Sequence, residues 1–288
     1  MGNYFLAIDQ GTTSTRTVLY DSNFTELDQN QIEITQYYPR PGYVEHDAQE
    51  IWDKTFSTVS SLLEKNGLET SQIISIGITN QRETIVGWDQ KTGKPIGRAI
   101  VWQDKRTTDY CKTLQNQGVE KEVIEKTGLL LDPYFSASKL RWLNDNFKEE
   151  IVNKNILFGT IDTFLLWKLT KGDIYATDVS NAARTSLLNI STLDWDQDLI
   201  KLFELEKINL PEIKKNADDF GSTTLFGGDI KISGMAGDQQ AALFGQTCFE
   251  AGDIKSTYGT GCFLILNTGN QILRSQNKLL TTIGYKID

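Results

Sequence analysis

The stretch SGMAGDQQAALFGQ, Ser233 to Gln246, places a lone carboxylate, Asp238, where a glycine-lined loop is expected to become a helix. Residues 229–233 before it alternate polar and apolar side chains, which is the pattern of a half-buried strand. Gln240 to Phe244 after it is a helix-forming run with two alanines. The stretch therefore predicts a strand, a loop and a helix, as expected in an α/β protein.

Two roles are open to Asp238 from this stretch alone. Aspartate is among the preferred N-cap residues, because its oxygens accept hydrogen bonds from the free backbone N–H groups of a helix. The alternative is a general base, or a carboxylate that orients a hydroxyl, held at the positive end of the helix where ionisation is favoured. The remaining motifs favour this second role.

The N-terminal stretch FLAIDQGTTSTRTVLY predicts a hairpin with a hydroxyl-rich tip. Phe5–Ile8 and Thr17–Tyr20 have the character of strands, and Gly11 allows a tight turn between them. Backbone N–H groups and hydroxyls at such a tip can hold a phosphate, and a carboxylate at the end of a strand can hold magnesium. An ordinary polar turn is the alternative. The candidates are Thr12, Thr13, Ser14 and Arg16 for phosphate and Asp9 for Mg²⁺.

A second stretch, AGDIKSTYGTGCFLILN at residues 251–267, repeats the pattern of strand, Gly-Thr turn and strand. Two such hairpins predict a duplicated architecture whose halves face a shared phosphate. The sequence ends at Asp288, soon after the second copy begins. We therefore expect a truncated chain, with an acceptor- and phosphate-binding half over residues 1–250 and only the first strands of a second half over residues 251–288.

Arg82 and Glu83 follow a predicted buried strand, Ile73–Ile78. Open α/β sheets bind their ligands at the carboxyl ends of strands. An adjacent Arg and Glu can grip a small polyol, since one donates to hydroxyls and the other accepts from them. A solvated charge pair is the commoner alternative, and aromatic residues such as Trp102 and Tyr134 belong more often to a core than to a ligand site.

Composition bounds the class of protein. The chain has 288 residues, a mass of 32.5 kDa, a formal net charge of -9 and a pI near 4.8. An acidic protein is poorly suited to neutralising a phosphate backbone, so a nucleic-acid partner is not expected. The N-terminus has a short apolar run without a preceding basic region, which predicts neither a signal peptide nor a membrane span. Three widely spaced cysteines suit a reducing compartment, and we expect a cytoplasmic location.

His46 is the one histidine of the sequence. A zinc-type ligand set, or catalysis of the Ser-His-Asp type, would have to rest on it alone. Because it lies just before a helix predicted to open at Asp47, a structural role is favoured.

Six motifs in order carry a family resemblance. They are DQGTTSTR, ITNQRET, AIVWQ, DPYFSASKLRWL, GMAGDQQAALFGQ and TYGTGCF. Together they resemble the FGGY family of carbohydrate kinases along the whole chain, and NQRET with AGDQQAALFGQ points to its glycerol kinases. The resemblance implies an actin-like, ribonuclease H-like α/β fold, with a mixed sheet flanked by helices and a second domain only begun. It also implies a cleft between two domains in which ATP and the acceptor meet.

The resemblance further implies a role for each matching residue. Asp238 would be the catalytic base that accepts a proton from glycerol as ATP phosphorylates it to glycerol 3-phosphate. The residues that would hold glycerol are Arg82, Glu83, Trp102, Tyr134, Asp238, Gln239 and Phe263. The residues that would contact the nucleotide phosphates are Thr12, Thr13, Ser14, Arg16 and Thr260, with Asp9 serving Mg²⁺.

Two other functions stay open. One is an FGGY kinase for a pentulose or another polyol. The other is a non-catalytic nucleotide switch of the actin or heat-shock chaperone type, against which ITNQRET and AGDQQ argue because such a switch needs no acceptor site. The expected partners are glycerol and ATP, and the resemblance is compatible with a homo-oligomer of the full-length protein. A chain that lacks most of the second half is expected to have low or no activity.

Overall fold

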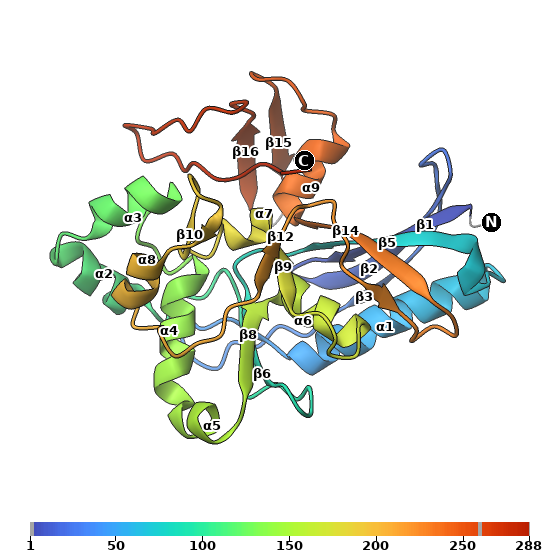
Figure 1. Ribbon diagram of the computed structural model, residues 1–288, viewed down its shortest axis with the longest axis horizontal. Coiled ribbons are helices and arrows are strands. Elements are labelled where there is room, and N and C mark those ends of the chain that lie inside the picture. The colour runs from blue at the N-terminus through green and yellow to red at the C-terminus, as the bar shows by residue number, and fades with distance from the viewer. Residues whose placement is uncertain (1–2, 259–260, 288) are drawn as a thin grey trace.

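The computed structural model describes residues 3–258 and 261–287. Its main element is a six-stranded mixed sheet with the order β13-β14-β5-β1-β2-β3 (Figure 1). The three central strands run parallel, and each outer strand is antiparallel to its neighbour. In sheet order the strands are β13 (Ser222–Thr223), β14 (Ile230–Gly237), β5 (Ile73–Asn80), β1 (Tyr4–Gln10), β2 (Ser14–Asp21) and β3 (Glu26–Glu33).

The register of the parallel strands brings three chain segments to one edge of the sheet. Gln10 of β1 lies opposite Asn80 of β5, and Asn80 in turn lies opposite Gly237 of β14. The three strands therefore end at the same level, and the segments that follow them begin side by side. Those segments carry six of the predicted site residues, at the edge where parallel sheets place their ligands: Thr12, Thr13, Arg82, Glu83, Asp238 and Gln239.

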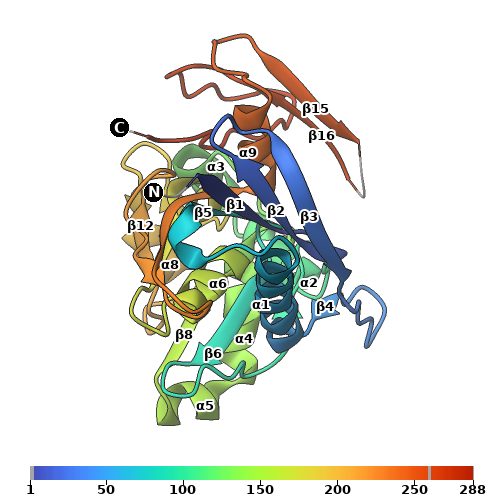
Figure 2. The ribbon, with the colours of Figure 1, turned by 90° about the vertical axis from the view of Figure 1, so that its right-hand side faces the viewer.

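One face of this sheet forms the main hydrophobic core. Side chains along β1 and β5 alternate between buried and half-buried positions, as the period of a strand requires. Helix α1 (Ala48–Lys65) packs against β1, β2 and β3, and α6 (Ile161–Leu169) packs against β5 (Figure 2). The buried strand residues of this core include Leu6, Ile8, Ile76 and Ile78.

A second, antiparallel sheet has the order β4-β7-β6-β8 and shares a second core with helices α2, α3 and α4. Its strands are β4 (Glu45–His46), β7 (Ala99–Ile100), β6 (Ile85–Asp89) and β8 (Ile156–Thr160). The remaining helices are η1 (Thr70–Gln72), α2 (Thr108–Asn116), α3 (Glu120–Thr127), α4 (Ser136–Asn146), α5 (Lys148–Asn153), α7 (Val179–Ala182) and α8 (Gln197–Leu202). Two small sheets pair β9 (Ala176–Asp178) with β12 (Glu212–Lys214), and β10 (Leu188–Asn189) with β11 (Asp194–Trp195). Within residues 3–258 and 261–287, no helix is long and apolar enough to cross a membrane.

The loop predicted before Asp238 is wrong. Strand β14 continues through Gly237, and α9 (Asp238–Gly245) begins at the next residue. Parallel pairing with β5 keeps this glycine-rich segment extended, so the strand passes directly into the helix. Gly237, with φ −59° and ψ 149°, is the N-cap, and Asp238 is the first helical residue. The N-cap role considered for Asp238 therefore belongs to Gly237.

The C-terminal hairpin forms a sheet of its own. Strands β15 (Ile254–Tyr258) and β16 (Cys262–Leu266) pair antiparallel, with Thr257 opposite Phe263. The hairpin predicted from the second Gly-Thr motif is therefore confirmed on both sides of its tip. Residues 259 and 260 of the tip lie outside the described part of the chain.

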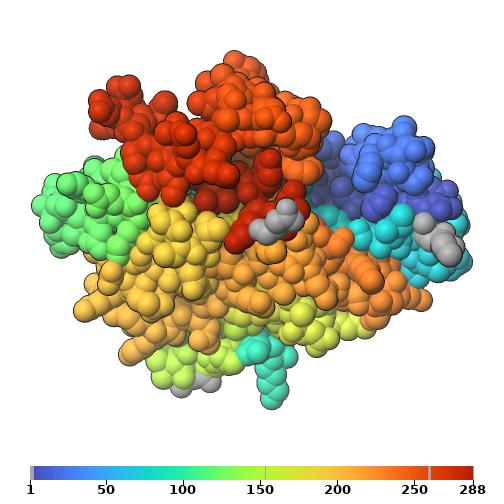
Figure 3. All heavy atoms as spheres, turned by 45° about the horizontal axis from the view of Figure 1, so that its top comes forward, coloured from blue at the N-terminus to red at the C-terminus, as the bar shows by residue number. Residues whose placement is uncertain are grey.

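Residues 268–287 return from this hairpin toward the rest of the protein, in red in Figure 3. The side-chain amide of Gln240 donates to the backbone oxygen of Ile283 at 3.1 Å. The backbone N–H of Asn216 donates to the oxygen of Lys286 at 2.8 Å. These bonds tie the C-terminal segment to α9 and to the segment before β14. The domain boundary after residue 250 stays a prediction.

Candidate active site

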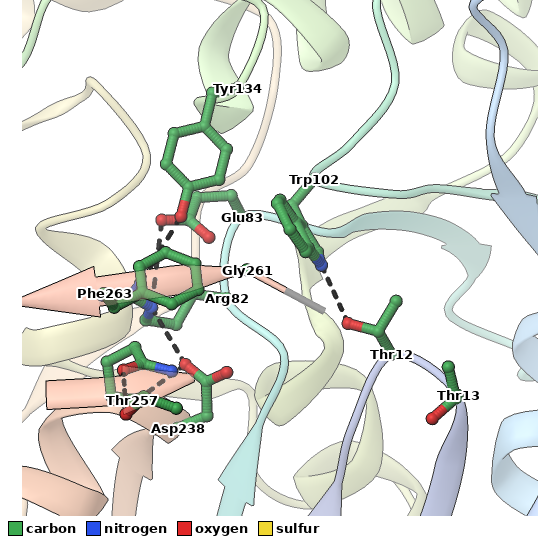
Figure 4. A pocket seen from close by; sticks show the side chains of 11 residues that line it. Thr12, Thr13, Arg82, Glu83, Trp102, Tyr134, Asp238, Thr257, Gly261 and Phe263 are labelled. Atoms are coloured by element: carbon green, nitrogen blue, oxygen red, sulfur yellow. Dashed lines mark hydrogen bonds and ion pairs between the residues drawn. The ribbon is translucent and has the colours of Figure 1, made fainter. Parts of the chain in front are cut away.

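A pocket with a volume of about 140 Å³ opens at the carboxyl edge of the main sheet (Figure 4). Its walls come from the segments after β1, β5 and β14, from the loop after β7, from the loop before α4 and from the C-terminal hairpin. The structure therefore brings together the residues predicted for the acceptor and two of those predicted for phosphate. The lining residues are Thr12, Thr13, Arg82, Glu83, Trp102, Tyr134, Asp238, Gln239, Thr257, Gly261 and Phe263.

Arg82 is the central cation of the pocket. Its side chain is 5% exposed, and its Nε lies 3.1 Å from Oδ1 of Asp238. Nη1 donates to Oε1 of Gln240 at 3.1 Å, and Nη2 donates to the hydroxyl of Tyr134 at 3.5 Å. The guanidinium also lies over the ring of Phe263, 5.7 Å from its centroid. A guanidinium held by charge, hydrogen bonds and an aromatic face presents its donors in a fixed geometry.

Glu83 is buried and has an unusual backbone conformation. Its φ of 60° lies in the left-handed region, which non-glycine residues seldom occupy and which is concentrated at functional sites. Its Oε1 accepts a hydrogen bond from Nε of Arg184 at 2.6 Å. The guanidinium of Arg184 in turn lies over the rings of Tyr134 and Phe135, at 5.5 and 5.0 Å. Sequence reasoning missed Arg184, because no local pattern signals a partner 101 residues from Glu83.

Asp238 is a carboxylate with a raised pKa that lines the pocket. Its side chain is 38% exposed on the pocket side, although protein atoms surround the rest of the carboxyl closely. Oδ1 accepts from the backbone N–H of Gln239 at 2.7 Å. Burial raises the pKa of Asp238 above its ordinary value, the Arg82 cation opposes the rise, and the charge of Glu83 adds to it. A carboxylate with a raised pKa that opens into a pocket is suited to accepting a proton.

Three aromatic rings form the apolar wall of the pocket. The indole of Trp102 meets the ring of Tyr134 edge to face at 5.6 Å, and that of Phe263 at 6.3 Å. The buried ammonium of Lys139 holds the segment before α4, because it donates to the backbone oxygens of Tyr134 at 2.5 Å and Phe135 at 3.1 Å. Burial lowers the pKa of Lys139 to about 7. Contacts between the rings and the Lys139 hydrogen bonds to the backbone therefore hold the wall in place.

The turn of the N-terminal hairpin lies beside this wall. Thr12 and Thr13 line the pocket, and Nε1 of Trp102 donates to Oγ1 of Thr12 at 2.9 Å. This bond connects the acceptor side of the pocket directly to the predicted phosphate side. Ser14 does not line the pocket, and its hydroxyl accepts from Nε2 of Gln31 at 2.8 Å.

Asp9 and Arg16, predicted for magnesium and phosphate, face each other across β1 and β2. Nη2 of Arg16 lies 2.7 Å from Oδ2 of Asp9, and neither residue lines the pocket. The described residues contain no group of three or more His, Cys, Asp or Glu side chains that could hold a metal ion. A single carboxylate still fits magnesium, which is usually bound by one or two carboxylates, water and substrate phosphates. Thr260, the last predicted phosphate contact, lies outside the described residues.

A buried polar network lies beneath the pocket and holds the ends of β5 and β14. The backbone N–H of Gly237 donates to Oγ of Ser180 at 3.0 Å, and that hydroxyl donates to Asp178. Nδ2 of Asn80 lies 3.3 Å from Oδ1 of Asp162. Burial and the charge of Asp178 raise the pKa of Asp162 to about 7. The start of α9, and with it the position of Asp238, therefore depends on this network.

His46 supports the N-terminal turn. Its Nδ1 lies 3.2 Å from Nε2 of Gln81, and its Nε2 lies 2.8 Å from Oε1 of Gln36. Gln36 in turn donates to the backbone oxygen of Thr12 at 2.8 Å. Burial lowers the pKa of His46 to about 4, so the imidazole is neutral near pH 7. The structural role predicted for His46 is confirmed by these contacts.

Two lining residues, Thr257 and Gly261, were not among the predicted site residues. The signal for Thr257 was present in the sequence, because antiparallel pairing of the second hairpin places it opposite Phe263. Side chains of directly opposed residues share one face of a sheet, so both point to the pocket together.

Comparison with known proteins identifies the family of the chain. Residues 4–245 match the N-terminal domain of the FGGY family of carbohydrate kinases. The chain belongs to the FGGY family of carbohydrate kinases. The resemblance inferred from its motifs is confirmed by this match, and the solved FGGY kinases that it resembles share the expected actin-like ATPase fold.

Relatives of this FGGY chain include glycerol kinases. The glycerol kinase of Rhizobium meliloti (strain 1021) is 54% identical over 293 residues, which cover 100% of this chain and 59% of the relative. The crystal structure of Plasmodium falciparum glycerol kinase with ADP has a TM-score of 0.93 at 38% identity, covering 99% of this chain and 58% of that one. The crystal structure of ligand-bound xylulose kinase from Lactobacillus acidophilus has a TM-score of 0.82 at 25% identity, covering 91% of this chain and 53% of that one. The FGGY chain thus spans 59% of the length of the curated relative.

Proposed function

We propose that the protein containing this chain transfers the γ-phosphoryl group of ATP to glycerol, with glycerol 3-phosphate and ADP as products. The observation that carries the proposal is the convergence of Arg82, Glu83 and Asp238 in one small pocket beside the N-terminal turn. Glycerol is preferred over a pentulose because the glycerol kinases are more similar in sequence, at 54% and 38% identity, than the xylulose kinase at 25%.

The size and lining of the pocket support a small polyol as acceptor. A volume of about 140 Å³ is well below the roughly 300–1,000 Å³ of pockets for drug-sized ligands. In the proposed complex Arg82 donates to glycerol oxygens, Glu83 accepts from its hydroxyls and the aromatic wall lies along its carbons. Convergent polar groups of this kind present one hydroxyl for reaction and hold the others away from it.

Asp238 would act on the presented hydroxyl. Its carboxylate takes the hydroxyl proton as the glycerol oxygen bonds to the γ-phosphorus, and the bond from that phosphorus to the oxygen of ADP breaks. Only the ionised carboxylate can accept the proton, and Arg82 at 3.1 Å favours that form. Its raised pKa makes Asp238 a stronger base than an ordinary aspartate.

The N-terminal turn would hold the nucleotide. We propose Asp9 for Mg²⁺ within the 1–250 half, and the hairpin of residues 251–288 would complete the phosphate site. Arg16 and Asp9 neutralise each other across the hairpin, so a phosphate oxygen and a metal ion could each replace one partner of this pair. Bound Mg²⁺ would supply charge neutralisation at the phosphate oxygens. The proposed phosphate contacts are Thr12, Thr13, Ser14, Arg16 and Thr260.

Phosphorus NMR of the reaction mixture tests this proposal. The protein containing this chain is incubated with magnesium-ATP and either glycerol or xylulose, with Asp238→Asn as the inactive control. We expect the glycerol 3-phosphate signal to grow as ADP appears in the glycerol sample, and little sugar phosphate with xylulose. A faster reaction with xylulose would assign the site to a pentulose, and ATP hydrolysis indifferent to both polyols would indicate a nucleotide switch.

A further inference from the structure

Lys255 is a buried cation on the C-terminal hairpin, outside every role assigned above. It lies on β15 beyond residue 245, where the match to the N-terminal domain ends, and it is 2% exposed. Burying an ammonium group is costly unless the group is paired and hydrogen-bonded. The buried ammonium of Lys255 therefore needs a hydrogen-bond acceptor close to it.

That partner is the side chain of Gln239. Nζ of Lys255 donates to Oε1 of Gln239 at 2.9 Å, and Oγ1 of Thr257 donates to the same oxygen at 3.2 Å. An amide oxygen has two lone pairs, and these two donors use both of them. The orientation of the amide is thereby fixed, with its oxygen on the hairpin and its N–H₂ group as the remaining, donating end.

The fixed amide lies beside the base. Gln239 follows Asp238 directly at the start of α9, and its backbone N–H donates to Oδ1 of Asp238 at 2.7 Å, a bond that lowers the pKa of Asp238 against the effect of burial. The charges of Lys255 and Asp238 also act on one another, since Asp238 raises the pKa of Lys255 against the effect of burial. The Lys255 ammonium thus holds the side chain of the residue whose backbone N–H bonds to the carboxylate.

One face of the hairpin carries both the residues that line the pocket and the two donors to the Gln239 side chain. Lys255 and Thr257 are two residues apart on β15 and so point to the same side of the strand. Thr257 is opposite Phe263, whose ring lies over Arg82. A shift of the hairpin would therefore move the wall and release the amide together.

We propose that Lys255 is a positioning residue of the acceptor site, which fixes the Gln239 amide and through it the Asp238 carboxylate. The inference rests on the proposed function, because it assigns Lys255 to the glycerol side of the same pocket. It makes the C-terminal hairpin part of the acceptor site as well as of the phosphate site.

The pKa of Asp238, followed by carbon NMR of its carboxyl across a pH titration, tests the inference without any ligand. Lys255→Met removes the ammonium and keeps the length of the side chain, and Lys255→Arg keeps a cationic donor. Lys231→Met, at an exposed position of β14, is the matched control. We expect the Asp238 pKa to rise by roughly one unit in Lys255→Met and to stay at the wild-type value in the other two. Glycerol affinity should fall about tenfold in Lys255→Met and recover in Lys255→Arg.

The outcomes separate this inference from the proposed function. An unchanged Asp238 pKa in Lys255→Met, or an equal rise in Lys255→Arg, would overturn the positioning role whatever the chain binds. A raised pKa in a chain that binds no glycerol would keep the positioning role and contradict the proposed function. If circular dichroism shows that Lys255→Met is unfolded, Thr257→Val decides the case, because it removes the second donor to the Gln239 oxygen and leaves the lysine. It should raise the Asp238 pKa by a smaller amount, and no rise would overturn the inference.

Discussion

Substitution of Gly237 by alanine tests how closely the proposed glycerol site depends on the packing of Arg82. The backbone at Gly237, with φ −59° and ψ 149°, is open to any residue, so alanine introduces no backbone strain. A methyl group there would lie 2.6 Å from both Cγ and Cδ of Arg82, well inside the contact distance of about 3.5–4.0 Å between carbons. We therefore expect Arg82 to move away from Asp238.

The size of the effect follows from the bond that is lost. In the proposed complex the displaced Arg82 no longer donates to a glycerol oxygen, and hydrogen bonds to charged groups contribute about 1.5–3 kcal/mol. Glycerol affinity should therefore fall by roughly 10- to 100-fold. Stability should change less, because overpacking costs about 1–3 kcal/mol while the Gly-to-Ala change in the unfolded chain returns about 0.4–1 kcal/mol.

Calorimetric titration with glycerol and thermal unfolding by circular dichroism measure the two effects separately. Gly245→Ala is the matched control, since it lies at the other end of α9 and a methyl group there meets no atom within 4 Å. The control should bind glycerol like the wild type and unfold at the same or a slightly higher temperature. Equal glycerol affinity in folded Gly237→Ala and Gly245→Ala would refute the reasoning.

Four further outcomes follow from the same contacts. Asp238→Asn should keep glycerol affinity within about tenfold but lose most turnover in initial-rate assays, and unchanged turnover would rule out the base. Because burial raises the pKa of Asp238, wild-type turnover should fall with decreasing pH before an ordinary aspartate would protonate, and a pH–rate profile that stays flat to about pH 4 would disagree. Arg184→Met leaves the buried Glu83 carboxylate without its 2.6 Å partner, so urea unfolding should show a loss of about 3–5 kcal/mol, and an unaltered midpoint would argue against the pair. Trp102→Phe keeps a ring but removes the donor to Thr12, so ATP affinity should fall by about 1 kcal/mol in a binding titration; a loss confined to glycerol would count against this link.

The sequence was sufficient for several of the elements that carry the site, because each of these had a local signal. The apolar run Ile73–Ile78 identified the buried strand before Arg82. Asp47 marked the start of a helix, which it caps by accepting from the N–H groups of Gln49 and Glu50. The segment before Asp238 was less well predicted, since its glycines indicate a loop. Pairing with a distant strand holds them extended instead, and that pairing has no local signal.

The partners behind the site residues could not be predicted for the same reason. Arg184 reaches Glu83 across 101 positions, and Lys255 reaches Gln239 only when the hairpin folds over α9. Both are buried charges whose positions are set by tertiary packing. Asp9 and Arg16, by contrast, were correctly predicted to share one hairpin, but the sequence did not indicate that they pair with each other.

Binding of glycerol and xylulose to this 288-residue chain, measured by calorimetry with and without magnesium-ATP, tests the central claim most directly. The residues proposed to hold glycerol all lie in the pocket that this chain forms, so we predict that glycerol binds and that xylulose binds more weakly. Tighter binding of xylulose, or no binding of either polyol in the presence of magnesium-ATP, would contradict the assignment of this pocket to glycerol.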